Sequence, residues 1–165
     1  MSVRVLVATA VSALLLAAPA AATPPRAGVV VPGVSLGGLA LGMTPAQVRS
    51  AWGSGYGLCR GCAATTWYYT YRPFTQQGAG VAFWKGRVAA LYTLWAPPGW
   101  TTPKRLTIGD PAAKITLLYG PMPLEQCFGY SALILRRGAT LTAFYVVDTK
   151  VYGFGLTRYG RSPCF

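Results

Sequence analysis

The chain has 165 residues, and its 15 Lys and Arg residues stand against only 3 Asp and Glu residues, which gives a formal net charge of +12. It contains no His, so Ser-His-Asp catalysis, Cys-His catalysis and His-based metal sites are excluded. A chain of this length suits one domain with a real hydrophobic core. We therefore expect no catalytic site, no metal and no cofactor.

The first 22 residues have the pattern of an export signal. Arg4 supplies the positive charge, residues 5–18 form an apolar run, and small residues at 18–22 offer a cleavage site. The apolar run is short for a membrane span, and a retained N-terminal anchor is the alternative. We predict a secreted or cell-envelope protein whose mature part begins near Thr23 and has no later transmembrane segment.

A repeated pattern divides the mature part into two units. The segment 39–53, which ends in Trp52-Gly53, returns as the segment 106–120, which ends in Tyr119-Gly120. Such self-similarity is typical of tandem structural repeats. We predict an extended lead-in at 23–38, a first α/β unit at 39–95, a linker at 96–105 and a second α/β unit at 106–165.

Each unit is expected to begin with a short helix. In the first unit, Thr44 is the expected N-cap, Pro45 is the first helical residue, and Gln47 completes a capping box. In the second unit, Asp110 and the following proline take these places. The pattern predicts helices at about 44–52 and 110–119.

Three strands are expected to follow each helix. Runs of β-branched and aromatic residues, separated by short turn sequences, predict antiparallel meanders. The predicted strands are 65–71, 80–84, 87–95, 130–136, 140–147 and 150–158. The whole is expected to be an α+β fold, with one antiparallel sheet of about six strands, both helices on one face, and the other face open to solvent.

The four Cys residues predict two disulfides, because an even number of Cys in an oxidising compartment is typical of a disulfide framework. Three pairings are possible, and we favour Cys59–Cys62 together with Cys127–Cys164, which would tie the C-terminal tail to the second unit. A redox-active dithiol at Cys59 and Cys62 is the alternative, but these residues precede a strand rather than a helix. A zinc site would need reduced thiols.

Two carboxylates offer an enzymatic alternative. Glu125 and Asp148 could form a general acid–base pair. Glu125 lies in a Pro-rich loop and Asp148 in a predicted hairpin turn, where solvated side chains are usual. We therefore expect a protein that binds rather than catalyses.

Aromatic and Arg side chains are expected to form a binding surface on the open sheet face. If Phe83 and Phe144 point toward the helices, strand alternation places Trp84 and Tyr145 on the open face. Aromatic contact area surrounded by Arg is typical of protein-binding and glycan-binding surfaces. The predicted binding residues are Trp67, Tyr69, Tyr71, Arg72, Trp84, Arg136 and Tyr145.

The expected partner is an extracellular protein or an anionic envelope polymer. A chain this basic is attracted to anionic surfaces, so the alternative function is a structural envelope protein held at wall or membrane surfaces by charge alone. Nucleic acid would also attract such a chain, but the export signal argues against it. The sequence leaves the oligomeric state open.

The repeated motifs also resemble those of a known family. The matching residues are Leu41-Gly42-Met43-Thr44, Val48, Trp52-Gly53 and Phe83, and then Ile108-Gly109, Ile115, Tyr119-Gly120 and Phe144. Over about 39–158 the chain resembles the beta-lactamase inhibitory protein-like tandem repeat. It also resembles the related small lipoproteins that assist outer-membrane barrel assembly, but their acylated Cys is absent. The resemblance implies a helix layer behind a curved sheet whose open face holds a protein partner.

Overall fold

The computed structural model describes residues 27–70 and 78–165, which form a mostly β, broadly α+β fold. The helices are α1 (Pro45–Trp52) and α2 (Ala113–Tyr119). The strands are β1 (Gly28–Val31), β2 (Ser35–Leu36), β3 (Gly57–Leu58), β4 (Thr65–Thr70), β5 (Gly78–Trp84), β6 (Arg87–Leu94), β7 (Trp100–Thr101), β8 (Leu124–Cys127), β9 (Tyr130–Arg137), β10 (Thr140–Val147) and β11 (Lys150–Arg158). Within these residues no helix has the length and apolar character that crossing a bilayer requires.

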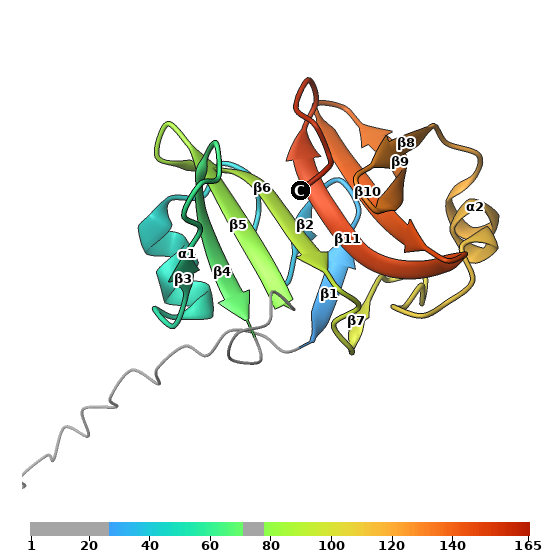
Figure 1. Ribbon diagram of the computed structural model, residues 1–165, viewed down its shortest axis with the longest axis horizontal. Coiled ribbons are helices and arrows are strands. Elements are labelled where there is room, and N and C mark those ends of the chain that lie inside the picture. The colour runs from blue at the N-terminus through green and yellow to red at the C-terminus, as the bar shows by residue number, and fades with distance from the viewer. Residues whose placement is uncertain (1–26, 71–77) are drawn as a thin grey trace, which may run out of the picture.

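Most strands belong to one antiparallel sheet of eight strands, in the order β3-β4-β5-β6-β11-β10-β9-β8. The two halves of the chain contribute four neighbouring strands each, and β6 pairs with β11 at the seam, with Leu91 opposite Leu156. Figure 1 shows α1 and α2 at the two outer ends of this sheet. The predicted number of about six strands is wrong, because residues 57–58 and 124–127, which read as loop sequence, add a strand at each edge.

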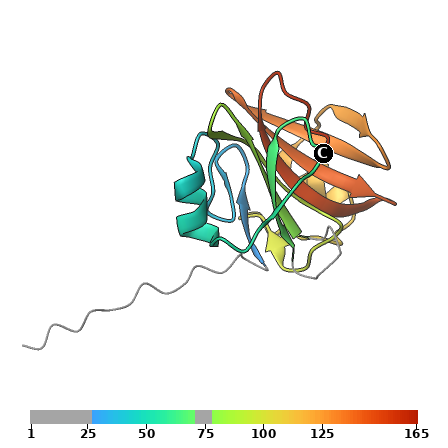
Figure 2. The same ribbon diagram turned by 60° about the vertical axis from the view of Figure 1, so that its left-hand side comes forward.

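A second sheet of three strands forms from segments that were expected to be connections. β1, in the lead-in, pairs antiparallel with β2 and parallel with β7 of the linker, where Val29 lies opposite Thr101. The prediction of a single sheet is therefore wrong. Figure 2 shows α1 and this small sheet gathered together, away from the C-terminus.

The first helix begins as its sequence predicts. The Gln47 amide donates to Thr44 Oγ1 at 3.2 Å, and the Thr44 amide donates to Gln47 Oε1 at 2.8 Å. This capping box satisfies amides that the first turn of a helix leaves free. Val48 and Trp52 form the buried side of the helix.

The second helix begins at Ala113, so the prediction of Asp110 as its N-cap is wrong. The Asp110 carboxylate instead accepts a hydrogen bond from the Thr107 amide at 2.7 Å and pairs with Lys114 at 2.8 Å. Burial alone would raise the pKa of Asp110, but the hydrogen bonds from Lys114 and Thr107 outweigh it and hold the pKa below its ordinary value. Asp110 thus closes the turn that precedes the helix.

The main hydrophobic core lies between the large sheet and the layer of helices and small strands. Phe83 and Phe144 belong to this core, which is the orientation that the sequence analysis assumed for them. Trp52 is central to it, since its ring meets the Tyr69 ring edge-on at 5.2 Å and its indole nitrogen donates to the Gly37 carbonyl at 2.9 Å. The large sheet therefore buries most of its helix-side face in this core. We call the opposite face of the sheet the second face.

Candidate binding site

Glycines on the second face make room for two tyrosine rings. Gly80 lies opposite Tyr92 in the β5–β6 pairing, and Gly153 lies opposite Tyr145 in the β10–β11 pairing. A methyl group added to Gly80 would overlap the Tyr92 ring, and one added to Gly155 would overlap the Tyr145 ring. Gly153 and Gly155 of β11 therefore leave the space on the sheet that the Tyr145 ring occupies.

The end of the chain, residues 159–165, crosses the second face, and we call it the tail. The fully buried Tyr145 donates its hydroxyl hydrogen to the Pro163 carbonyl at 2.6 Å. The Phe165 ring stacks on the Tyr92 ring, with their centroids 4.3 Å apart. The Tyr130 hydroxyl donates to the Phe165 carbonyl at 2.8 Å and accepts from the Phe165 amide at 2.6 Å. The second face is therefore not open at its centre, contrary to the prediction.

A disulfide holds the tail in place. Cys164 of the tail is bonded to Cys127 at the end of β8, with their Cα atoms 5.5 Å apart. Cys59 and Cys62 form the other disulfide, with a Cα–Cα distance of 5.7 Å. Both predicted pairings are confirmed. The sequence predicted that this disulfide ties the tail to the second unit, but not that the tail then crosses the face of the sheet.

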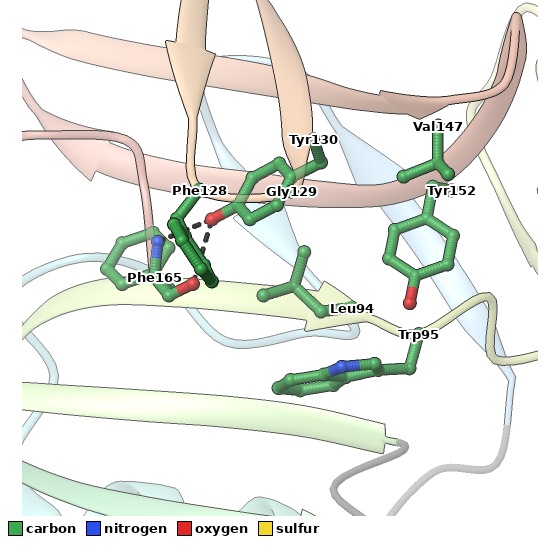
Figure 3. A pocket seen from close by; sticks show the side chains of 8 residues that line it. All are labelled: Leu94, Trp95, Phe128, Gly129, Tyr130, Val147, Tyr152 and Phe165. Atoms are coloured by element: carbon green, nitrogen blue, oxygen red, sulfur yellow. Dashed lines mark hydrogen bonds between the residues drawn. The ribbon is translucent and has the colours of Figure 1, made fainter.

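Beside the tail lies a hollow of about 370 Å³ with aromatic walls. Figure 3 shows Trp95 and Tyr152 on one side of it and Phe128, Tyr130 and Phe165 on the other. Phe128 is 102% exposed at the rim. We call this cavity the aromatic hollow. The sequence analysis did not predict this cavity. The one residue that could have indicated it is Phe128, a large apolar residue in the turn between β8 and β9.

The wall that carries Trp95 has a strained backbone. Trp95 and Ala96 have φ angles of 63° and 51°, a region that residues with side chains seldom adopt. The Ala96 amide donates to the Tyr152 carbonyl at 2.9 Å and so holds the turn. Such conformations cost about 1–3 kcal/mol each and cluster at binding and catalytic sites.

Among the described residues, no charged side chain lines the aromatic hollow. Burial raises the pKa of Tyr92 and of Tyr145 far above the ordinary value, so their hydroxyls beneath the tail stay neutral. The site suits an apolar or aromatic group of a ligand.

The two carboxylates of the enzymatic alternative lie on separate elements: Glu125 in β8, 3.8 Å from Cys164 Sγ, and Asp148 in the β10–β11 turn.

Three of the predicted binding residues are buried, so their expected exposure is wrong. Trp67 and Tyr69 are 6% and 0% exposed on the helix side, where Trp67 stacks on Tyr56 at 3.8 Å. They share the face of Phe83, whose ring lies 4.6 Å from that of Trp67. Tyr145 faces away from the helices, as alternation requires, but the tail covers it.

Two other predicted residues are accessible. Trp84 is 50% exposed, and Arg136 is exposed with its guanidinium carbon 3.8 Å from the centre of the Tyr159 ring. Tyr71 and Arg72 lie outside the described residues. The structure does not bring Trp84 or Arg136 to the aromatic hollow, and their role in binding stays a prediction.

No protein-family model matches the chain, and a comparison with curated proteins gives no match. Solved structures of similar fold include a DUF4309 family protein of Bacillus subtilis, with a TM-score of 0.53 and 14% identity over 82% of this chain and 86% of that one. They also include an extracellular protein of Bacillus anthracis that contains an SCP domain, with a TM-score of 0.53 and 11% identity over 72% of this chain and 44% of that one.

A cysteine-rich secretory protein of Staphylococcus aureus has a TM-score of 0.50 and 15% identity over 84% of this chain and 50% of that one. The chain thus spans half or less of the last two proteins. At such identities the likeness shows the fold alone. It neither supports nor refutes the resemblance to the beta-lactamase inhibitory protein-like repeat, which stays a prediction.

The contact between Gly155 and Tyr145 predicts a cost for one added methyl group. Gly155→Ala should lower the free energy of unfolding by about 1–3 kcal/mol, because overpacking would displace a ring that the tail holds from above. Gly57→Ala is the matched control, since a methyl group there meets open space. Chemical denaturation of the oxidised proteins measures both values, and similar losses in the two variants would contradict the packing described here.

The two disulfides should differ in their contribution to stability. Replacing Cys127 and Cys164 by Ser should cost about 4 kcal/mol in the chain-entropy model, because these residues are separated by 37 positions. Replacing Cys59 and Cys62, which are separated by 3 positions, should cost about 2 kcal/mol. Thermal or denaturant unfolding compares the double variants, and a larger loss from the short-range pair would be the contrary result.

Proposed function

We propose that this protein is a secreted, non-catalytic binding protein that holds an apolar segment of another extracellular protein in the aromatic hollow. One observation carries the proposal: an aromatic cavity whose described lining has no charged side chain, with the fully exposed Phe128 at its rim, in a chain whose net charge is +12. Aromatic anchors in desolvated recesses supply most of the binding energy at protein interfaces. A recess without cationic side chains favours a protein segment over an anionic polymer as the ligand.

Location outside the cytoplasm has independent support. Disulfides persist in oxidising compartments, and the described residues contain two. Two proteins of similar fold are described as extracellular and as secretory. The export signal expected at residues 1–22 lies outside the described residues, and it points the same way.

The resemblance to the inhibitory-protein repeat also favours a protein partner. It implies that the face opposite the helices receives the partner. In this chain the tail covers the centre of that face, where Tyr145 binds Pro163. The partner would therefore contact the rim of the aromatic hollow, and inhibition of an enzyme is one form that such binding could take.

The alternative is a structural envelope protein that is tethered by charge alone. It is favoured by the scarcity of internal ion pairs: within residues 27–70 and 78–165, the only one joins Lys114 to Asp110. Most cationic side chains there are thus available to anionic surfaces. Attraction of this kind weakens steeply with salt, which separates the two candidates.

The test begins with capture of partners from an extracellular or envelope fraction by the disulfide-bonded mature protein, with washes at low and then high salt. The affinity of a retained partner is then measured for Phe128→Ala and for Leu117→Ala, an exposed apolar control on α2. We expect Phe128→Ala to weaken binding at least about tenfold, or roughly 1.4 kcal/mol, and Leu117→Ala to leave it unchanged. Phe128 is fully exposed, so its loss should not unfold the protein.

Two results would contradict the proposal. Equal affinity of Phe128→Ala and the unsubstituted protein for the partner would remove the aromatic hollow from the interface. Release of every captured molecule at high salt would leave the charge-tethered envelope protein as the better account.

A further inference from the structure

Four cationic side chains meet Trp84 at the end of the large sheet that lies away from the aromatic hollow. Lys85 lies in the β5–β6 turn, Arg87 begins β6, Arg158 ends β11, and Arg161 belongs to the tail. Together with the adjacent backbone of β6, these five residues line a hollow of about 360 Å³. We call it the cationic cleft.

The sheet register explains this convergence. β6 and β11 are antiparallel neighbours, with Ala90 opposite Thr157, so the start of one strand lies beside the end of the other. The aromatic hollow is built at the opposite end of the same two strands, by Trp95 and Tyr152. The two cavities are therefore separate sites on one pair of strands.

No carboxylate neutralises the cationic cleft. The chain has three acidic residues, all of them described. Asp110 is paired with Lys114, and neither Glu125 nor Asp148 forms an ion pair in the described part of the chain. A recess lined by charges of one sign concentrates the electric field and attracts counter-ions. The four cations are thus available to an external anion.

Two of the four cations, Arg161 and Arg87, are held by contacts that leave their charges unneutralised. The Arg161 guanidinium carbon lies 4.7 Å from the centre of the Trp84 ring. Arg87 Nη1 donates to the Gly42 carbonyl at 3.3 Å. The Gly42 loop is itself fixed to β6, because the Gly42 amide donates to the Val88 carbonyl at 2.8 Å and the Val88 amide donates to the Met43 carbonyl at 2.8 Å. Such preorganisation lowers the cost of binding.

We propose that the cationic cleft binds a phosphate group carried on a small polyol or sugar, with Trp84 as the contact for the organic part. Arg guanidinium groups match the oxygens of a phosphate through paired hydrogen bonds. A cluster of four cations suits a phosphate better than a singly charged carboxylate. The volume of about 360 Å³ is in the range of small-ligand sites. The inference is independent of the proposed function, which concerns the aromatic hollow.

Calorimetry measures the affinity of the protein for glycerol phosphate. Glycerate replaces the phosphate by a carboxylate and tests the choice of anion. Phosphatidylglycerol vesicles test whether the phosphate belongs to a lipid headgroup. The variant Arg158→Gln with Arg161→Gln removes two cleft charges. Arg105→Gln with Lys150→Gln removes two exposed charges elsewhere and is the matched control. Circular dichroism checks that both variants fold.

We expect the unsubstituted protein to bind glycerol phosphate more tightly than glycerate. Affinity should fall at least tenfold in the Arg158 and Arg161 variant and less than about twofold in the control, since distant charges are screened. Binding to vesicles alone, if it is lost only in the cleft variant, would support the phosphate site and assign the phosphate to a lipid headgroup. Equal losses in both variants, equal affinity for glycerate, or no binding to either phosphate probe would overturn the proposal.

Discussion

The contact of Tyr145 with the tail is the interaction on which both candidate sites depend. The ring lies over Gly153 and Gly155, and its hydroxyl donates to the Pro163 carbonyl at 2.6 Å. The resulting path carries Phe165 to the wall of the aromatic hollow and leaves Arg161 at the cationic cleft. A larger residue in place of Gly155 would displace the ring and weaken its contact with the tail, whereas one in place of Gly153 would overlap the Thr93 carbonyl of β6.

The seam between β6 and β11 gives the molecule two chemically different ends. At one end, Trp95 and Tyr152 supply uncharged surface; at the other, Arg87 and Arg158 supply positive charge without internal counter-ions. An uncharged recess and a cationic recess can act together, because one selects an apolar group while the other draws the protein toward an anion. A secreted binder that is first concentrated at an anionic surface and then engages a protein there would use both.

Local signals in the sequence predicted the parts of the fold that local physics determines. The capping box at Thr44 and the hairpin turns follow from short-range geometry, and the structure confirms them. The favoured disulfide pairings are confirmed as well, but Cys127–Cys164 joins residues 37 positions apart and was chosen among three possible pairings. The faces of strand residues were predicted less well, because alternation shows which residues share a face but not which layer covers it. Trp67 therefore lies in the core, and Tyr145 lies under a tail whose path no local pattern encodes. The short edge strands were missed because residues 57–58 and 124–127 carry few β-forming residues.

The most direct test of this account is hydrogen exchange at the backbone amide of Phe165. A free chain terminus exchanges at the rate of an unfolded peptide. Because this amide donates to the Tyr130 hydroxyl in a docked tail, we expect slow exchange in the disulfide-bonded protein and fast exchange once Cys127 and Cys164 are replaced by Ser. Exchange at the unfolded rate in the disulfide-bonded protein would contradict the docked tail, and with it the parts of the two candidate sites that Phe165 and Arg161 supply.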